Sequence, residues 1–450
     1  MRGFPTISPT ISIVALSLAA LVTLGACESL PDWLGEPEAP PLPGKRIAVM
    51  SLDNTLRVDT GIADLAVRLP RPLLNREWPQ DGGYANHAMH HLEATGALAR
   101  LWDADIGEGA AADGGVLSSP VSGGGRVFSL DAVGTVSAFR ADNGERLWQV
   151  NVVPEEEEDE AIGGGIAYAA ERLFVSTGVG EVIALDAATS NEIWRVGVGA
   201  PVRVAPTVSD DRVFVITYEN ALFALDANDG STLWNHSGIT EDAQLLGGAS
   251  PAVSGGLVIA AYSSGEIFAL RVDNGSEAWN YTLGSNSRLG PLASLGDING
   301  SPVIDDEQVY AVSHAGRLVA LSLRSGERLW DQNISGVQTP WIAGNFLFIL
   351  TSQGELLCLS RQDGRIRWIR RLPRYEDPEA KDDPIIWSGP LLVSDRLIVV
   401  SSTGKAVSIS PYTGDYLGQV EMPGDIEMSP IASNGLVYIL TLAGKLIALR

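Results

Sequence analysis

The chain has 450 residues, of which 31 are basic (Lys or Arg) and 55 are acidic, and its formal net charge is −24. A charge this negative argues against binding to nucleic acid and against electrostatic attachment to anionic lipid surfaces. Five histidines, scattered through the sequence, are too few for a convincing metal site.

The N-terminal segment has an apolar run from Ile11 to Leu24 that follows the basic residue Arg2. An apolar stretch this short that ends in small residues is typical of a secretory signal peptide and not of a spanning helix. Its last residues, Leu24-Gly-Ala-Cys27, resemble the bacterial lipobox. That resemblance implies a signal peptide over residues 1–26, cleavage before Cys27 and lipidation of this cysteine. The alternative is an ordinary signal peptide with a cysteine there by chance.

Residues 27–75 are expected to form a lipidated tether. The stretch from Pro31 to Pro43 contains five prolines and little that could form a core, which predicts an extended chain. Glu28, and not Asp, follows the cysteine, and in the sorting pattern of enteric lipoproteins this implies the outer membrane. The sequence leaves open whether Lys45 to Asn75 packs against the following domain or stays mobile.

From Trp78 onward, one pattern recurs eight times. A glycine, or once an asparagine, opens a strand that ends in a small residue and usually leucine, a tight turn follows, and the next strand typically closes with tryptophan. An all-strand pattern with a period of roughly 40–50 residues is typical of β-propellers with four strands per blade. We therefore predict an all-β fold, an eight-bladed β-propeller of four-stranded antiparallel blades, over residues 76–450. The eight copies begin at Gly134, Gly180, Asn220, Gly265, Gly316, Gly354, Gly404 and Gly444.

The two ends of the propeller are predicted to share a blade. The last blade stops at Arg450 after its third strand, and a spare outer strand with the expected tryptophan lies at Ala97–Trp102, before the first full repeat. This strand should complete the last blade and close the ring. Closure of this kind removes the open sheet edges that invite aggregation.

Six tryptophans occupy the same position in the outer strand: Trp148, Trp194, Trp234, Trp279, Trp330 and Trp368. We expect them to wedge between neighbouring blades, and a ligand-stacking set is the alternative. Gly418 stands at this position in the seventh blade, which predicts that the loosest joint lies there. Cys358 stands where other blades have alanine and is expected to be a small core residue. With Cys27 lipidated, it is also the one thiol left, so no intramolecular disulfide can form.

Motifs for catalysis or metal binding are weak. His87, His90 and His91 form the one histidine cluster, and their place before the first repeat favours packing or capping over metal binding. The sequence has no Gly-x-Ser-x-Gly elbow, phosphate-binding loop or paired-carboxylate motif. The acidic run Glu155–Glu160 is interpreted as a solvated loop, with a cation site or a basic-partner site as the alternative. We therefore assign no catalytic residue, metal or cofactor.

The Gly…Trp repeat resembles that of the pyrroloquinoline quinone dehydrogenases. The resemblance implies an enzyme that holds the quinone beneath a disulfide between adjacent cysteines and uses calcium with a catalytic aspartate. This chain has no Cys-Cys pair and no Cys-x-x-Cys-His haem site, and it lacks the length for the additional loops of those enzymes. A quinone dehydrogenase, or a propeller that binds a small ligand or a peptidoglycan fragment, is therefore the alternative and not the leading interpretation.

The lipobox, the tether and an eight-bladed ring without quinone or metal ligands together resemble the BamB family, the outer-membrane lipoproteins of the β-barrel assembly machinery. The resemblance covers nearly the whole chain and includes Trp78-Pro-Gln-Asp-Gly-Gly83, which is similar to a Trp-x-Gln-x-Gly-Gly segment of that family. It implies a non-catalytic protein that is lipid-anchored on the periplasmic face of the outer membrane. The implied partners are the periplasmic domains of the BamA-type insertase, other lipoproteins of the assembly complex and unfolded outer-membrane protein clients.

The resemblance also implies a partner-binding surface on loops of neighbouring blades. An apolar-plus-arginine segment before the inner strand of blade three is matched by Val198, Val202 and Arg203, although the arginine is displaced. An Asp-x-Asp segment before the inner strand of blade five is matched by Asp297 and Asn299, with asparagine in place of the second acid. An arginine and an aspartate on adjacent loops could form charge-assisted contacts to a partner. The alternative is that the two polar residues of blade five cap a turn.

Two further interpretations concern the surface. Trp387, in the long loop from Arg370 to Ser388, is out of register with the repeated tryptophans and is a candidate interface anchor. An exposed blade edge could also pair with unfolded client strands by β-augmentation, but the sequence does not indicate which edge.

Overall fold

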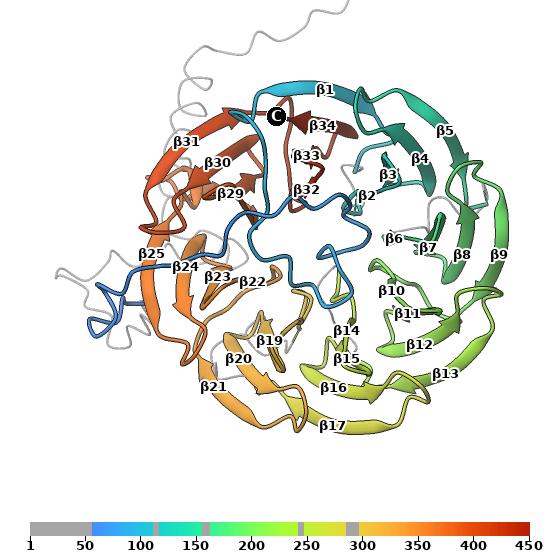
Figure 1. The fold of residues 1–450 in the computed structure, drawn as a ribbon, viewed down its shortest axis with the longest axis horizontal. Coiled ribbons are helices and arrows are strands. Elements are labelled where there is room, and N and C mark those ends of the chain that lie inside the picture. Colours follow the sequence, from blue (N-terminus) through green and yellow to red (C-terminus); the bar gives the residue numbers. More distant parts are fainter. Residues whose placement is uncertain (1–55, 111–116, 155–162, 242–246, 285–296) are drawn as a thin grey trace, which may run out of the picture. The chain divides into compact units, whose positions relative to one another are not determined.

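The computed structural model describes residues 56–110, 117–154, 163–241, 247–284 and 297–450. The signal peptide, Cys27, the proline-rich stretch and the acidic run Glu155–Glu160 lie outside these residues. The described chain forms a ring of eight four-stranded antiparallel sheets (Figure 1), so the predicted eight-bladed propeller is confirmed. In the described part, no helix is long and apolar enough to cross a membrane.

The blades are numbered along the chain, and their strands run from the inside of the ring to the outside. Blade 1 contains β2 (Val121–Gly123), β3 (Arg126–Leu130), β4 (Thr135–Arg140) and β5 (Arg146–Asn151); blade 2, β6 (Gly164–Ala169), β7 (Arg172–Thr177), β8 (Glu181–Asp186) and β9 (Glu192–Gly197); blade 3, β10 (Thr207–Ser209), β11 (Arg212–Ile216), β12 (Ala221–Asp226) and β13 (Thr232–Ser237); blade 4, β14 (Ala252–Ser254), β15 (Leu257–Ala261), β16 (Glu266–Arg271) and β17 (Glu277–Thr282). Blade 5 contains β18 (Val303–Asp305), β19 (Gln308–Ser313), β20 (Arg317–Ser322) and β21 (Arg328–Gln332); blade 6, β22 (Trp341–Ala343), β23 (Phe346–Leu350), β24 (Glu355–Ser360) and β25 (Ile366–Arg371); blade 7, β28 (Trp387–Val393), β29 (Arg396–Ser401), β30 (Lys405–Ile409) and β31 (Tyr416–Glu421); blade 8, β32 (Ile431–Ser433), β33 (Leu436–Leu440), β34 (Lys445–Leu449) and β1 (Arg100–Asp105). A separate hairpin, β26 (Tyr375–Asp377) and β27 (Asp382–Pro384), lies in the connection between blades 6 and 7.

Burial explains where each strand lies within its blade. The second strand of blade 3, β11, is buried along nearly its whole length because both of its faces pack against neighbouring blades, and it is rich in valine and isoleucine. The outer strand of the same blade, β13, alternates exposed and half-buried residues. Cys358 in β24 is fully buried, as predicted, and burial raises the pKa of its thiol.

Ring closure occurs as predicted. Strand β1 pairs antiparallel with β34 and places Trp102 opposite Ala448. The strand begins at Arg100 and not at Ala97, because the chain before it turns through Leu98, which has a positive φ of 60°. The first and last strands of the ring therefore belong to one sheet.

Tryptophans on the outer strands join one blade to the next at seven of the eight joints. Each indole N–H donates to a backbone carbonyl of the following blade: Trp102 to Ala141, Trp148 to Ala187, Trp194 to Ala227, Trp234 to Val272, Trp279 to Leu323, Trp330 to Arg361 and Trp368 to Pro411, at 2.7–3.1 Å. This geometry supports the predicted wedge and not a ligand-stacking set. Gly418 takes the tryptophan position in blade 7, and the looseness of that joint stays a prediction.

The turn glycines of the blades serve these joints as well. Gly326 has a positive φ of 69°, which suits the tight turn before the outer strand, and a Cβ on it would lie 2.6 Å from the ring of Trp279. Glycines of the other blades repeat this contact with the tryptophan of the preceding blade: Gly144, Gly230, Gly275, Gly364 and Gly414. The glycine of each tight turn therefore serves the joint between blades as well as the turn itself.

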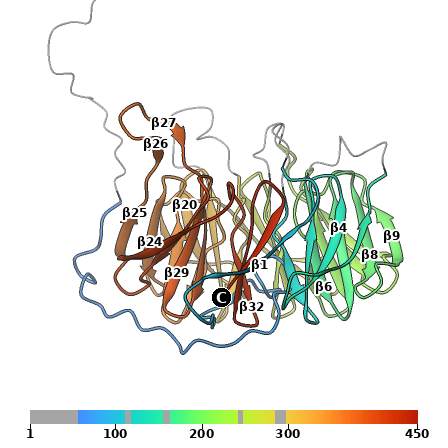
Figure 2. The ribbon, with the colours of Figure 1, turned by 90° about the horizontal axis from the view of Figure 1, so that it is seen from above.

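A segment that the repeat does not include crosses one end of the ring; we call residues 75–95 the strap. Figures 1 and 2 show it in blue across the centre of the ring and along one end of the blades. It bonds to all eight blades in turn: Trp78 N–H to Ser122 O (2.9 Å), Tyr168 N–H to Pro79 O (2.6 Å), Val208 N–H to Gln80 Oε1 (2.7 Å), Val253 N–H to Ala85 O (2.6 Å), Ile304 N–H to Asn86 O (2.9 Å), Trp341 Nε1–H to His90 O (2.7 Å), Leu92 N–H to Leu392 O (3.3 Å) and Asn434 N–H to Asn75 O (2.7 Å). The strap thus supplies partners to polar groups at the inner edges, which would otherwise lie open along the channel.

The residues before the strap also pack on the ring, which answers part of the question left open for Lys45–Asn75. Ile62 and Val67 are buried. The Asp59 N–H donates to the Ile366 carbonyl at 2.9 Å, and Arg367 Nε donates to the Leu65 carbonyl at 2.6 Å. Residues 59–65 therefore lie against blade 6, and the chain then continues into the strap.

The three clustered histidines belong to the strap, and each contacts a different part of the molecule. Nδ1 of His87 lies 2.8 Å from the Pro302 carbonyl, and Nδ1 of His91 lies 2.7 Å from the Pro70 carbonyl. Nε2 of His90 lies 3.5 Å from the Asp305 carboxylate. Among the described residues, no group of three His, Cys, Asp or Glu side chains could hold a metal ion.

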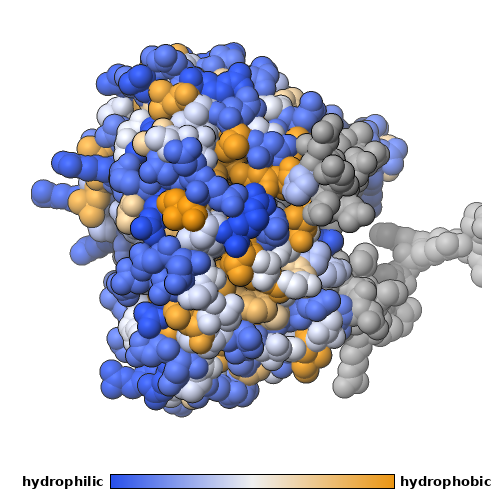
Figure 3. Space-filling model, turned by 90° about the vertical axis from the view of Figure 1, so that its right-hand side faces the viewer, coloured by the Kyte–Doolittle hydropathy of each residue, from blue (hydrophilic) through white to orange (hydrophobic). Residues whose placement is uncertain are grey.

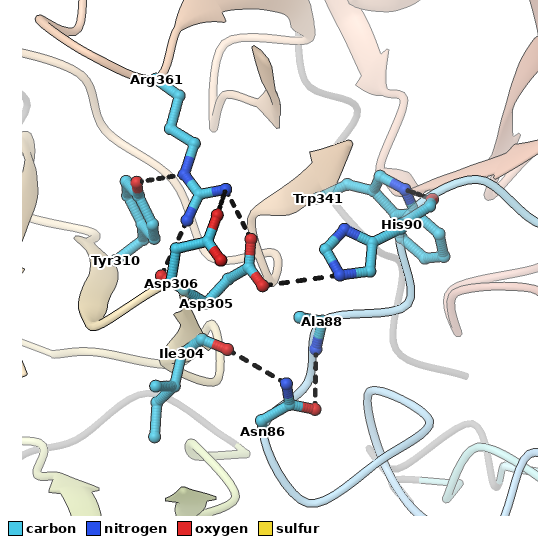
Figure 4. Close-up of polar contacts among 9 residues, drawn as sticks. All are labelled: Asn86, Ala88, His90, Ile304, Asp305, Asp306, Tyr310, Trp341 and Arg361. Atoms are coloured by element: carbon cyan, nitrogen blue, oxygen red, sulfur yellow. Dashed lines mark hydrogen bonds and ion pairs between the residues drawn. The ribbon is translucent and has the colours of Figure 1, made fainter. Parts of the chain in front are cut away.

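A buried ion pair joins blades 5 and 6 next to the strap (Figure 4). Arg361 Nη1 donates to the Asp305 carboxylate at 2.5 Å, its Nη2 donates to the Asp305 carbonyl at 2.7 Å, and its Nε donates to the Tyr310 hydroxyl at 2.7 Å. Burial raises the pKa of Tyr310 to about 12, so this hydroxyl stays neutral and can accept that bond. The Arg361 carbonyl also accepts the indole N–H of Trp330. Arg361, which directly follows β24 of blade 6, therefore bonds to residues of three strands of blade 5: β18, β19 and β21.

The outer side of the ring has no large apolar surface in the view of Figure 3. That figure faces the blades drawn at the right of Figure 1, and apolar side chains appear there in separate patches among hydrophilic ones. Leu147, Ile193 and Leu233 are exposed on the outer strands of blades 1 to 3. Scattered exposed residues of this kind are normal for a soluble surface.

Candidate docking face and central cavity

The structure brings the two predicted loop segments to one place. Residues 198–203 connect β9 to β10, and residues 297–299 lead into β18, so both lie where the chain enters an inner strand. Arg203 and Asn299 line the same small pocket of about 30 Å³, together with Tyr218 and Gly247. We call the end of the ring that carries these connections the loop face. The strap contacts the inner strands toward their other end, and Figure 2 shows the strap and the β26–β27 hairpin at opposite ends.

Arg203 lies over an aromatic ring. Its guanidinium carbon lies 4.1 Å from the centroid of the Tyr218 ring, a cation–π contact that fixes the planar group. Its Nε is buried and has no hydrogen-bond partner in the described residues. The side chain is only half-buried, so its remaining N–H groups can reach a partner's carboxylate.

Four of the six predicted contact residues are buried and not surface contacts in this structure. Val198 and Val202 pack in the core between blades 2, 3 and 4, and Asp297 is 1% exposed. Trp387 is 8% exposed, and its indole N–H donates to the Pro373 carbonyl at 2.8 Å, below the β26–β27 hairpin. These side chains position the loops, which leaves Arg203 and Asn299 as the accessible pair.

A second and larger cavity lies in the middle of the ring. It has a volume of about 220 Å³ and is bounded by Trp78, Asp81 and His87 of the strap. Residues that precede the inner strands, such as Gln338 and Glu427, line the rest. Gly248 and Asn299 line both this cavity and the Arg203 pocket. The two sites are therefore contiguous on the loop face.

Sequence reasoning did not find this cavity. Its strap residues lie outside the repeat, and nothing in their spacing indicates that Asp81 and His87 face residues more than 200 positions later, such as Ser301 and Pro302. The available signal was Trp341, which directly follows the proline of an inner strand and does not match the outer-strand position. It stacks on Trp78 with ring centroids 6.2 Å apart.

Comparisons with known proteins agree with this architecture. A family model described as "Outer membrane protein assembly factor BamB" matches residues 132–370. The outer membrane protein assembly factors BamB of Yersinia pestis and Shewanella oneidensis are 27% and 26% identical, each over 77% of this chain and 87% of their own length. An uncharacterized protein of Rickettsia prowazekii is 29% identical over 62% of this chain and 66% of its own length.

Solved structures show the same fold. BamB from Moraxella catarrhalis superposes with a TM-score of 0.67 at 21% identity, over 79% of this chain and all of that chain (100%). A europium-containing methanol dehydrogenase gives a TM-score of 0.63 at 16% identity, over 81% of this chain and 89% of its own. At these identities, each likeness shows the fold alone. Because the family model matches more than half of the sequence, the chain belongs to the BamB family of outer membrane protein assembly factors.

Proposed function

We propose that this protein is a non-catalytic scaffold subunit of the outer-membrane β-barrel assembly complex. It binds the periplasmic domains of a BamA-type insertase through its loop face and aids the delivery and insertion of outer-membrane proteins. The observation that carries this proposal is the pocket shared by Arg203 and Asn299, since it joins two loop segments in a protein of this family. Other lipoproteins of the complex and unfolded clients are further proposed partners.

The proposal includes a location. Lipidation of Cys27 anchors the protein to the periplasmic face of the outer membrane, and the chain between the anchor and the ring acts as a tether. The strap occupies one end of the ring, so the loop face at the other end is the face available for docking. The charge of −24 disfavours direct adhesion to an anionic surface, which is consistent with attachment through lipid and through a protein partner.

Replacing Arg203 with glutamate should weaken binding to the purified periplasmic domains of the insertase by about 2–3 kcal/mol, roughly 30- to 150-fold in Kd. The change removes the guanidinium that is stacked on Tyr218 and places a carboxylate where the partner's acidic group would lie. Biolayer interferometry of the two purified proteins measures the effect. We prefer this variant to Asp297→Arg because the buried position of Asp297 makes a charge reversal there a test of folding.

The matched control is Arg324→Glu. Arg324 is 86% exposed in the turn between β20 and β21, at the strap end of the ring. This variant has the same change of charge and should bind like the unaltered protein. If the Arg203 variant binds as tightly as the unaltered protein, the loop face is not the surface that binds the insertase. An equal loss of binding in both variants, with circular dichroism unchanged, would have the same meaning.

A further inference from the structure

The central cavity is a closed-ended cup. The strap forms its floor, and the connections into the inner strands form its rim on the loop face. Its charged lining is acidic: Asp81 lies in the floor and Glu427 at the rim, and among the described residues no lysine or arginine lines it. Its volume of about 220 Å³ is below that of pockets for drug-sized ligands and suits an occupant the size of a side chain.

His87 presents an unused hydrogen-bond acceptor in the floor. Its side chain is 4% exposed, and its Nε2 has no hydrogen-bond partner in the described residues. Its Nδ1 lies 2.8 Å from the Pro302 carbonyl, which can only accept, so Nδ1 carries the proton and Nε2 carries a lone pair. Burial lowers the pKa of His87 against the opposing effect of Asp81, so the neutral ring is the form present.

The geometry holds this ring in place. A Cβ on Gly82 would lie 2.8 Å from the His87 ring, so the glycine allows the strap to pass directly against it. Asp81 is fixed from the other side, since its Oδ2 accepts a hydrogen bond from Ser301 Oγ at 3.0 Å. Ser301 is itself buried and accepts the Ser250 N–H at 3.0 Å. Two acceptors, a carboxylate and an imidazole nitrogen, are therefore preorganised in one floor.

The floor also contains a donor. The indole Nε1–H of Trp78 is buried and has no acceptor among the described residues. Trp78 and the stacked Trp341 form an aromatic wall, and aromatic faces attract cations. A matching occupant must bring cationic N–H donors for Asp81 and His87 and a carbonyl oxygen for Trp78. A basic residue within a peptide has both groups.

We propose that the central cavity binds a lysine or arginine side chain presented by a peptide segment that enters from the loop face. The cation contacts Asp81 and the aromatic wall of Trp78 and Trp341. His87 Nε2 and the Trp78 N–H are closed to solvent in the free protein, and they gain a partner when the strap side chains shift around the bound peptide. The site adjoins the Arg203 contact but has the opposite charge preference, since Arg203 attracts acidic groups, and it does not depend on the identity of the docking partner. Together, the two neighbouring sites would recognise a peptide surface that carries both an acidic and a basic group.

The test uses the mature full-length chain and three probes: acetyl-Gly-Arg-Gly-amide, the same peptide with norleucine in place of arginine, and agmatine as a free guanidinium compound. Isothermal titration should show binding of the arginine peptide, weaker binding of agmatine and no binding of the norleucine peptide. Asp81→Asn should weaken arginine-peptide binding by about tenfold or more, because a charge-assisted contact becomes a neutral one. The control Asp229→Asn, in an exposed turn of blade 3, should leave it unchanged.

The outcomes separate this inference from the proposed function. Arg203→Glu should not affect the arginine peptide, whereas it should weaken insertase binding. Absence of arginine-peptide binding, or binding that Asp81→Asn does not change while circular dichroism is native, overturns the inference. Agmatine that binds as tightly as the peptide overturns the peptide part, since a free amine or guanidine would then be the ligand.

Discussion

Replacing Arg361 with alanine should lower the free energy of unfolding by about 3–5 kcal/mol, because the change leaves a buried charge without its partner. The Asp305 carboxylate is 11% exposed and would lose its guanidinium, and the Tyr310 hydroxyl would lose its donor. The same arginine lies at the joint of blades 5 and 6, and its partner Asp305 also lies 3.5 Å from Nε2 of His90 in the strap (Figure 4). Guanidinium chloride unfolding, followed by circular dichroism, measures the change in midpoint.

Arg324→Ala is the matched control for this experiment. Its ion pair with Glu307 is 3.6 Å long, and both side chains are more than two-thirds exposed. Such pairs contribute about 0–1 kcal/mol, so this variant should unfold near the unaltered midpoint. Adding Asp305→Asn to Arg361→Ala should restore part of the lost stability, since it removes the orphaned charge. Equal midpoints for Arg361→Ala and Arg324→Ala would show that the buried pair contributes no more to the free energy of unfolding than the exposed pair does.

Replacing Trp102 with alanine should destabilise the ring by about 3–5 kcal/mol, the usual effect of removing a buried large aromatic side chain. Trp102 is 8% exposed, and it packs against Tyr438 with ring centroids 5.8 Å apart. Its indole N–H donates to the Ala141 carbonyl, so it joins the closing blade to blade 1. The same denaturant titration measures the effect, and limited proteolysis should show earlier cleavage near β1.

Leu101→Ala tests whether the effect comes from the joint. Leu101 is the neighbouring residue in β1 and is 45% exposed, so its truncation leaves no cavity and should change stability by less than about 1 kcal/mol. Both variants keep the backbone pairing of β1 with β34. A similar loss for both variants would mean that the strand, and not the tryptophan wedge, closes the ring.

The repeat made most of the fold predictable from the sequence. The strand-opening glycines, the tight turns and the outer-strand tryptophans recur in nearly every copy, so each blade supports the assignment of the others. Ring closure followed from counting, since one outer strand was spare at Trp102 and one was missing after Arg450. The tryptophan contacts between blades could be predicted because tryptophan occupies the same outer-strand position in six of the repeats.

The strap could not be predicted in the same way. Most of its contacts are made by backbone groups, as at Pro79, Ala85 and Asn86, which bond to inner strands. Backbone groups are present in every residue, so such contacts leave no periodic pattern of side chains. The cavity above the strap was missed for the same reason.

The predicted docking residues show where a linear motif is insufficient. The apolar residues Val198 and Val202 fit the motif, but the structure uses them as core. Arg203 remained accessible because Tyr218, from the next hairpin, supports its guanidinium from one side. Whether a residue of this segment is buried or accessible depends on the neighbouring blade, so it cannot be inferred from the segment alone.

The assembly role is tested most directly by affinity capture of the protein from crosslinked outer-membrane envelopes, followed by mass spectrometry of the recovered proteins. The account predicts that the BamA-type insertase is recovered with the unaltered protein and with Arg324→Glu, and is strongly depleted with Arg203→Glu. Captures of the unaltered, folded protein that lack the insertase would contradict the scaffold function itself.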